Sequence, residues 1–239
     1  MTPVLLPAPR ERILQAALAL LESGGVEAVS TRAVSAAAGV QPPTIYRQFG
    51  DMQGLLNAVA SVGFTAYLRT KTAQAPLSDP VEELREGWRT YVGFGLAHPH
   101  LYTLMYASSQ TSMEAPAALE AAAVLRALMR RVAEAGRLAV SVERAAIMIH
   151  AAALGTALSL LGDRTGDSDS SGDGELSEQM LEAVLNTVLV PSAGTAGVPV
   201  QQSQAAAHAV SLAALLPGLQ ARFSEAEHAL LLDWLRRLM

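Results

Sequence analysis

The sequence predicts an all-α protein, and three observations support this. Apolar residues recur at helical spacing along most of the 239-residue chain, no convincing alternating strand pattern appears, and glycines, prolines and capping residues separate the periodic segments. Because 51% of the residues are hydrophobic, the chain can bury a substantial core. The absence of cysteine excludes disulfides and thiolate metal sites, and suits a reducing cytoplasm.

Four helices are predicted in the N-terminal part of the chain, over residues 10–23, 31–37, 42–48 and 52 to the low seventies. The Gly24-Gly25 pair ends the first, Ser30 caps the second, Gly39 makes the turn before the third, and Asp51 caps the fourth. In the fourth helix two glycines allow either bending or close packing: Gly54 and Gly63.

Beyond residue 75 about seven further helices are predicted. They begin after Asp79-Pro80 and at Pro99, and then cover 116–135, 141–161, 176–189, 203–216 and 224–238. Asp79, Pro80 and Glu82 have the order of an N-cap, first-turn proline and first-turn acid, and Ser224 with Glu227 is a capping box. The predicted division is a three-helix N-terminal domain over 1–56 and a larger helical domain over 57–239, with extra helices at about 203–238.

Residues 30–49 have the pattern helix, tight glycine turn, helix, which is typical of a helix-turn-helix. Val34, Ala37 and Val40 are expected to pack against the second helix, at Ile45 and Phe49. The opposite face of that second helix is then free to contact a partner.

Polar and proline side chains occupy this free face. Pro42 and Pro43 start the second helix, where amide hydrogens have no intrahelical acceptor, and they offer an apolar surface suited to a thymine methyl group. Hydrogen-bonding groups that can reach phosphates or base edges follow them: Thr44, Tyr46, Arg47 and Gln48. The alternative is a proline-started helix that simply packs in a bundle.

Three segments within residues 10–60 resemble the DNA-binding domain of the TetR (tetracycline-repressor) family: RERILQAALALLESGG, VSTRAVSAAAGV and PPTIYRQFGDMQGLLNAV. The resemblance implies that Thr31 and Arg32 contact phosphates and that Arg47 contacts a phosphate or a base. It also implies a recognition surface made of Gln41, Pro42, Pro43, Thr44, Tyr46 and Gln48. The chain departs from the family in having Met52 at a position that is usually lysine.

The segment WRTYVGFGLAHPHLYTLMY, residues 88–106, resembles a TetR subfamily with a Trp-His-Gly element in its C-terminal domain. The family resemblance implies that the C-terminal helices bind a ligand and dimerise. Aromatic rings and methionines suit an apolar or aromatic ligand, although each residue alone also fits an ordinary core. The predicted pocket residues are Trp88, Tyr91, Phe94, Met105, Tyr106, Met113, Met148 and His150.

The predicted homodimer interface lies within about 141–189. Ala151, Ala152, Ala153 and Gly155 permit close helix approach, and an apolar seam is expected from Leu181, Val184, Leu185 and Val188. The charge-free stretch 145–162 approaches the length of a membrane span, but its alanines and polar residues indicate a buried or interface helix, so no membrane association is expected.

Two segments contain residue types that can bind metals. His98-Pro99-His100 fits a helix-starting turn better than a metal site, since its histidines do not share a helix face. Five residues of the loop 167–178 fit EF-hand spacing: Asp167, Asp169, Ser171, Gly172 and Glu178. A polar connector explains this loop more simply, and the sequence leaves both interpretations open.

The resulting hypothesis is a homodimeric, cytoplasmic transcriptional regulator that represses by binding palindromic double-stranded operator DNA and is released by a small apolar or aromatic effector. No signal peptide, catalytic set, cofactor motif or metal-ligand cluster is expected, so the protein is not predicted to be an enzyme. Residues 1–60 carry four arginines and four acids, a neutral balance that keeps an alternative open. That alternative is an all-α scaffold that binds a ligand or protein without DNA affinity.

Overall fold

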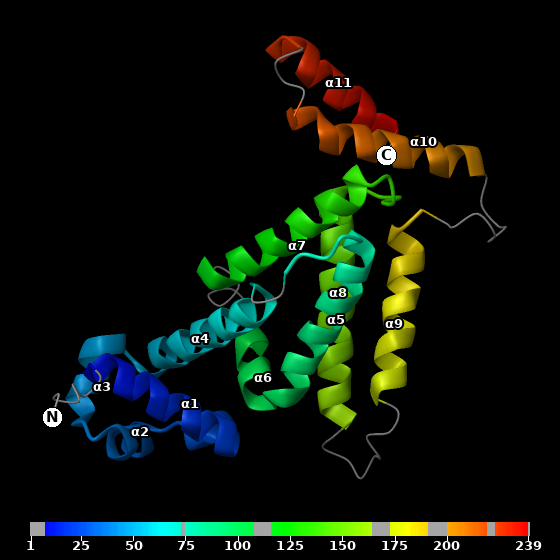
Figure 1. Ribbon diagram of the computed structural model, residues 1–239. Coiled ribbons are helices and arrows are strands. Elements are labelled where there is room, and N and C mark those ends of the chain that lie inside the picture. Colours follow the sequence, from blue (N-terminus) through cyan, green and yellow to red (C-terminus); the bar gives the residue numbers. More distant parts are fainter. Residues whose placement is uncertain are drawn as a thin grey trace, which may run out of the picture. The chain divides into compact units, whose positions relative to one another are not determined.

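The computed structural model describes residues 8–72, 75–107, 116–163, 173–190, 200–218 and 223–238. These residues form helices without any strand, apart from an isolated antiparallel bridge between Leu138 and Leu189, which confirms the predicted fold class (Figure 1). The helices within the described residues are α1 (Pro9–Ala28), α2 (Thr31–Ala38), α3 (Pro42–Phe49), α4 (Met52–Thr72), α5 (Pro80–Ala97), α6 (Pro99–Ala107), α7 (Pro116–Glu134), α8 (Val142–Asp163), α9 (Asp173–Val188), α10 (Val200–Leu215) and α11 (Glu225–Leu238).

The predicted caps form the expected hydrogen bonds. The backbone N–H of Ala33 donates to Ser30 Oγ at 3.2 Å, and the N–H of Gly54 donates to Asp51 Oδ1 at 2.7 Å. At the start of α11 the N–H of Ser224 donates to the Glu227 carboxylate at 2.8 Å and the N–H of Glu227 donates to Ser224 Oγ at 3.4 Å, which together form the predicted capping box. Local side-chain chemistry therefore sets these helix boundaries.

The glycine pair at the end of α1 interrupts the helix without ending it. Gly24 has φ −153° and Gly25 has φ 70°, both non-helical, yet helical hydrogen bonding resumes and continues to Ala28. The predicted stop is therefore a kink. Only Gly25 lies in the left-handed region that favours glycine.

The chain divides into two compact units. The first combines Met1–Gln74 with Gly93–Ala121, and the second combines Ala75–Val92 with Ala122–Met239. The boundary predicted at residue 56 falls inside α4, where Leu55 and Val59 are both buried in the same core. Packing thus joins α1, α2 and α3 to the whole of α4 and to α6.

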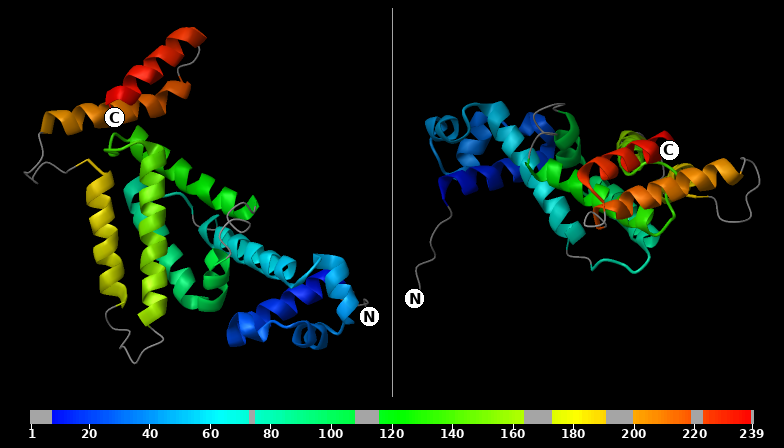
Figure 2. Two further views of the ribbon diagram at one scale, coloured as in Figure 1. Left: turned by 180° about the vertical axis from the view of Figure 1, so that it is seen from behind. Right: turned by 90° about the horizontal axis from the view of Figure 1, so that it is seen from above.

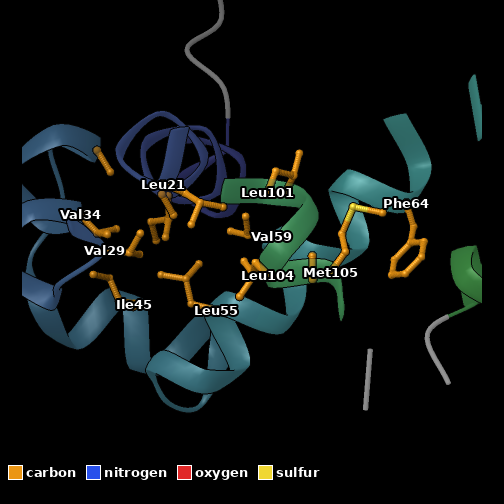
Figure 3. Close-up of a cluster of buried hydrophobic side chains, with 14 of the residues drawn as sticks. Leu21, Val29, Val34, Ile45, Leu55, Val59, Phe64, Leu101, Leu104 and Met105 are labelled. Atoms are coloured by element: carbon orange, nitrogen blue, oxygen red, sulfur yellow. The ribbon is translucent and has the colours of Figure 1, made fainter. Parts of the chain in front are cut away.

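Side chains from α1 to α4 and from α6 converge on the core of the first unit, as the labelled residues in Figure 3 show. Its members include Leu21, Val34, Ile45, Leu55, Val59, Phe64, Leu101 and Met105. A Cβ added at Gly63 would lie 2.7 Å from Met105 Sδ and 3.0 Å from a Leu101 methyl group. Close packing of α4 against α6 therefore explains Gly63, without any need for bending.

In the second unit α8 and α9 lie side by side (Figures 1 and 2). Salt bridges attach α5 to α9, one between Arg85 and Glu182 and one between Arg89 and Glu178, the latter at 2.8 Å. Between them, Trp88 Nε1 donates to Ser177 Oγ at 3.0 Å. Because Trp88 is only 2% exposed, it is a buried, hydrogen-bonded core residue.

The α10–α11 hairpin has a small core of its own, formed by Ala209, Leu216 and Leu235. The two helices run alongside each other in both views of Figure 2.

One helix among the described residues is long and apolar enough to cross a membrane. It is Val142–Gly162 in α8, with a mean hydropathy of 1.7 over a window that is 39% buried. Core helices of soluble proteins have the same properties, so this helix is weak evidence for a membrane span.

Candidate nucleic-acid interface

The turn between α2 and α3 depends on Gly39. Its φ of 62° and ψ of 42° are left-handed, and no atom lies within 4 Å of where a Cβ would be. Backbone conformation, and not crowding, is therefore what favours glycine here. The turn brings Val34 and Ile45, each 0% exposed, into the same core.

One detail of the predicted packing is wrong. Ala37 is exposed, whereas its neighbour Ala38 is 6% exposed and belongs to the core. A short helix places successive residues about 100° apart, so a one-residue error in the predicted face exchanges a buried position for a solvent position.

The face of α3 opposite the core is open to solvent. Ile45 is the buried residue of this helix, while Thr44 and Phe49 are partly buried. The predicted recognition residues are otherwise exposed: Gln41, Pro42, Pro43, Tyr46, Arg47 and Gln48. The two prolines occupy the first two helical positions, and Gln41 precedes them in extended conformation.

Thr31 and Tyr46 meet across the turn, although fifteen residues separate them in sequence. Thr31 Oγ1 and the Tyr46 hydroxyl are 3.0 Å apart, and either can donate the hydrogen bond. Thr31 is the first residue of α2, and the exposed Arg32 follows it. The structure therefore places the predicted phosphate-contacting residues beside the predicted base-reading residues.

A second contact was not predicted from the sequence. The Arg10 guanidinium carbon lies 5.0 Å from the centroid of the Phe49 ring, a cation–π geometry that links the start of α1 to the end of α3. No local sequence signal relates residues thirty-nine positions apart. This contact places another cation at the end of the recognition helix.

The predicted effector residues lie in both units. Trp88, Tyr91, Met148 and His150 belong to the second unit, and Phe94, Met105 and Tyr106 to the first, whereas Met113 lies outside the described residues. In the second unit the Tyr91 and His150 rings meet edge to face at 5.9 Å. Burial lowers the pKa of His150, which favours the neutral imidazole.

In the first unit five aromatic residues make ring contacts in two groups and are together called the aromatic cluster here: Phe64, Tyr102 and Tyr106 in one group, and Tyr67 and Phe94 in the other. Ring centroids are 5.7 Å apart for Phe64 and Tyr106, 5.8 Å for Tyr67 and Phe94, and 4.9 Å for Tyr102 and Tyr106. Burial, with a smaller contribution from nearby Tyr106, raises the pKa of Tyr67, so its phenol is neutral.

The sequence prediction missed three members of this aromatic cluster, Phe64, Tyr67 and Tyr102. Phe64 and Tyr67 are three residues apart on α4 and so share a helix face, but that signal was not distinguishable from an ordinary core stripe.

Two of the described candidate metal ligands, His98 and Glu178, have protein partners. His98 Nδ1 lies 3.3 Å from the Glu22 carboxylate, and the Glu178 carboxylate is bound by Arg89. The other EF-hand positions, 167–172, lie outside the described residues. No group of three or more histidine, aspartate or glutamate side chains suited to a metal occurs in the part of the chain that the structure describes.

Solved structures confirm the fold. A protein of unknown function from Rhodococcus sp. RHA1 is 24% identical with a TM-score of 0.63, over 79% of this chain and 99% of its own. A putative tetR-family regulator from Shewanella sp. PV-4 is 19% identical with a TM-score of 0.59, over 77% and 100%. A TetR variant from Acinetobacter baumannii AYE in complex with minocycline is 18% identical with a TM-score of 0.55, over 74% and 94%.

Two family models match the chain, whereas no curated protein matches it. Residues 13–59, which contain the α2–α3 surface, match the bacterial regulatory proteins of the tetR family. Residues 84–184 match the tetracyclin repressor-like C-terminal domain. Because the two matches together cover more than half of the chain, with the recognition surface inside the first, this chain belongs to the tetR family of transcriptional regulators.

Proposed function

We propose that the protein is a homodimeric, cytoplasmic repressor that binds palindromic operator DNA and is released by a small apolar or aromatic effector. The observation that carries the proposal is the division of α3 into two faces. Ile45 is fully buried, and the side chains that can read DNA are exposed on the other face. A helix that only packed in a bundle would not need exposed hydrogen-bonding side chains on its other face.

The DNA contacts follow from side-chain chemistry. Pro42 and Pro43 contact thymine methyl groups, Thr44 and Gln48 reach base edges, and Arg47 reaches a phosphate or a guanine. Thr31 and Arg32 bind phosphate at the start of α2, where the helix dipole favours an anion. The hydrogen bond between Thr31 and Tyr46 supports joint action of these two groups of residues.

The homodimer uses α8 and α9, with only part of the residue set that the sequence predicted. Leu181, Val184, Leu185 and Val188 are at most 9% exposed within one chain, so they do not form the apolar seam between two chains. The predicted Ala151 and Gly155 are exposed, and other open residues lie at helical spacing with them: Ile147 and Leu158 on α8, and Leu176, Met180 and Ala183 on α9.

This face of α8 and α9 is apolar and has small residues at its centre. Ile147 is 69% exposed, and nothing lies within 4 Å of a Cβ at Gly155. A second chain that covers this face would bury several apolar side chains and place two recognition helices on one duplex.

The effector is proposed to be uncharged and aromatic or apolar. The aromatic cluster contributes rings and phenols from α4, α5 and α6, and its Tyr67 is neutral. A charged ligand would lose its hydration among these rings, which disfavours it. The finer assignment to the Trp-His-Gly subfamily remains part of this proposal.

Release follows from linkage between ligand and DNA binding. The α4 helix packs against α3 and α6, so an effector that shifts α6 also shifts the recognition helix. Changing occupancy from nearly complete to nearly absent requires roughly 5 kcal/mol of differential binding between the two conformations.

Selection of bound duplexes from a random DNA library tests the function, followed by titration of the selected duplex at several salt concentrations. The proposal is supported if the selected duplex is palindromic and is bound by a dimer with an affinity that falls steeply as the salt concentration rises. If no duplex is enriched, also after unfolding and refolding to remove a copurified effector, the scaffold without DNA affinity replaces it.

A further inference from the structure

The last two helices are an addition to the shared family architecture. The C-terminal family model ends at residue 184, and the Rhodococcus structure covers 79% of this chain although 99% of its own length is matched. The α10–α11 hairpin begins at Val200. A function of this hairpin therefore lies outside the part of the chain that the family models match, and it goes beyond the proposed repressor activity.

Helix α11 has two apolar faces, and only one of them is covered. The inner face packs on α10 through Leu231, Leu232 and Leu235. On the outer face Leu230, Trp234 and Leu238 are 49%, 55% and 58% exposed. Their spacing of four residues forms a continuous stripe, and exposed tryptophan in such a stripe is typical of an interface.

We propose that this outer stripe of α11 pairs antiparallel with α11 of a second copy of the chain. In the register that centres the two-fold axis at residue 232, Leu230 packs against the partner's Trp234. The bulky Leu238 then covers the partner's Ala226, a small exposed residue on the same face. The two-fold symmetry repeats this contact of Leu238 with Ala226 at the other end of the helix pair.

Charge selects the antiparallel orientation. Glu227 and Arg237 flank the stripe at opposite ends of α11, so the antiparallel register places Arg237 beside the partner's Glu227 at each end. A parallel pair would place each charge beside its own copy, which is repulsive. Arg237 is 73% exposed in its side chain while bridging Asp233, so it can reach a second acid. By helical periodicity Arg236 is on a different face of α11 from the stripe.

Crosslinking in the full-length protein tests the register, because the chain has no cysteine of its own. A Leu230→Cys variant places two thiols near the two-fold axis, where a short bismaleimide can join them. An Ala229→Cys variant is the matched control, since that residue is exposed on α11 but off the stripe. The expected result is a several-fold higher yield of covalent dimer from Leu230→Cys.

Charge reversal in the Leu230→Cys background completes the test. Arg237→Glu should lower the dimer yield about tenfold, because it replaces an attractive pair by a repulsive pair at both ends. Arg236→Glu makes the same charge change off the stripe and should leave the yield unchanged. Equal yields from the two cysteine variants, an absence of crosslinked dimer, or equal losses from both arginine variants would each overturn the pairing. The pairing does not require the α8–α9 contact, so either can fail alone.

Discussion

Thr31 Oγ1 and the Tyr46 hydroxyl are joined by a hydrogen bond of 3.0 Å that crosses the turn between α2 and α3. Tyr46 remains 44% exposed, so its ring is held in position while one face stays available to a partner. In the proposed complex with DNA, the bond would hold both side chains in place before DNA binds, which would reduce the entropy cost of ordering them.

Tyr46→Phe, which keeps the ring and removes the hydroxyl, should weaken operator binding by about three- to tenfold, as expected for one hydrogen bond. Thr31→Val should have a similar effect, and the double variant should lose little more than either single variant. Fluorescence anisotropy with labelled operator measures all four proteins. Fully additive losses would show that the two hydroxyl groups act independently.

Arg32→Ala and Arg47→Ala should each reduce the slope of log affinity against log salt by about 1, because each removes one phosphate contact. Arg130→Ala serves as the control, since Arg130 is an exposed arginine on α7, outside the recognition surface. Titration of the selected operator at several salt concentrations gives the slopes. If Arg130→Ala changes the slope as much as Arg47→Ala does, overall charge and not local contact governs binding.

Ile147→Glu should shift the protein from dimer to monomer at micromolar concentration and abolish tight operator binding, because it places a carboxylate in the apolar face of α8. Leu119→Glu is the matched control, since Leu119 is also exposed, at 56%, but lies on α7. Sedimentation velocity distinguishes the two species. A dimeric Ile147→Glu variant would exclude this face as the interface.

The salt bridge between Arg89 and Glu178 should make stability depend on pH. The hydrogen bond from Arg89 lowers the pKa of Glu178 in the folded protein. The resulting stabilisation is present above the unfolded-state pKa and is lost as pH falls through the lowered folded-state pKa. Arg89→Met should lower Tm at neutral pH, and its difference from the wild type should shrink in acid. A difference that is constant with pH would assign the loss to packing of the arginine stem.

Two glycine-to-alanine substitutions should change the free energy of unfolding in opposite directions. Gly39→Ala should lower the free energy of unfolding by about 1 kcal/mol, because alanine is strained at positive φ. Gly93→Ala should raise it by about 0.5–1 kcal/mol, because Gly93 is inside α5 with open space around its Cβ position. Urea denaturation measures both. Equal changes in the free energy of unfolding would show that backbone conformation does not determine which residue is tolerated at position 39.

The sequence by itself determined the helices and the exposed side of α3, because both depend on local chemistry. Ser30, Asp51 and Ser224 cap helices through hydrogen bonds to residues only three positions away, so these caps do not depend on tertiary packing. The positive φ at Gly39 is likewise a local property of the turn. The exposed residues of α3 follow from helical periodicity once Ile45 is assigned to the core.

Only the tertiary structure decided which apolar helix faces are buried by packing within one chain. Leu181 and Ile147 are both apolar residues at helical spacing, yet Leu181 is 0% exposed and Ile147 is 69% exposed. Periodicity gives the faces of a helix but not the neighbour that covers each face. The same limit applies to the contact of Arg10 with Phe49 and to the outer stripe of α11, since long-range packing is not encoded in residue spacing along the chain.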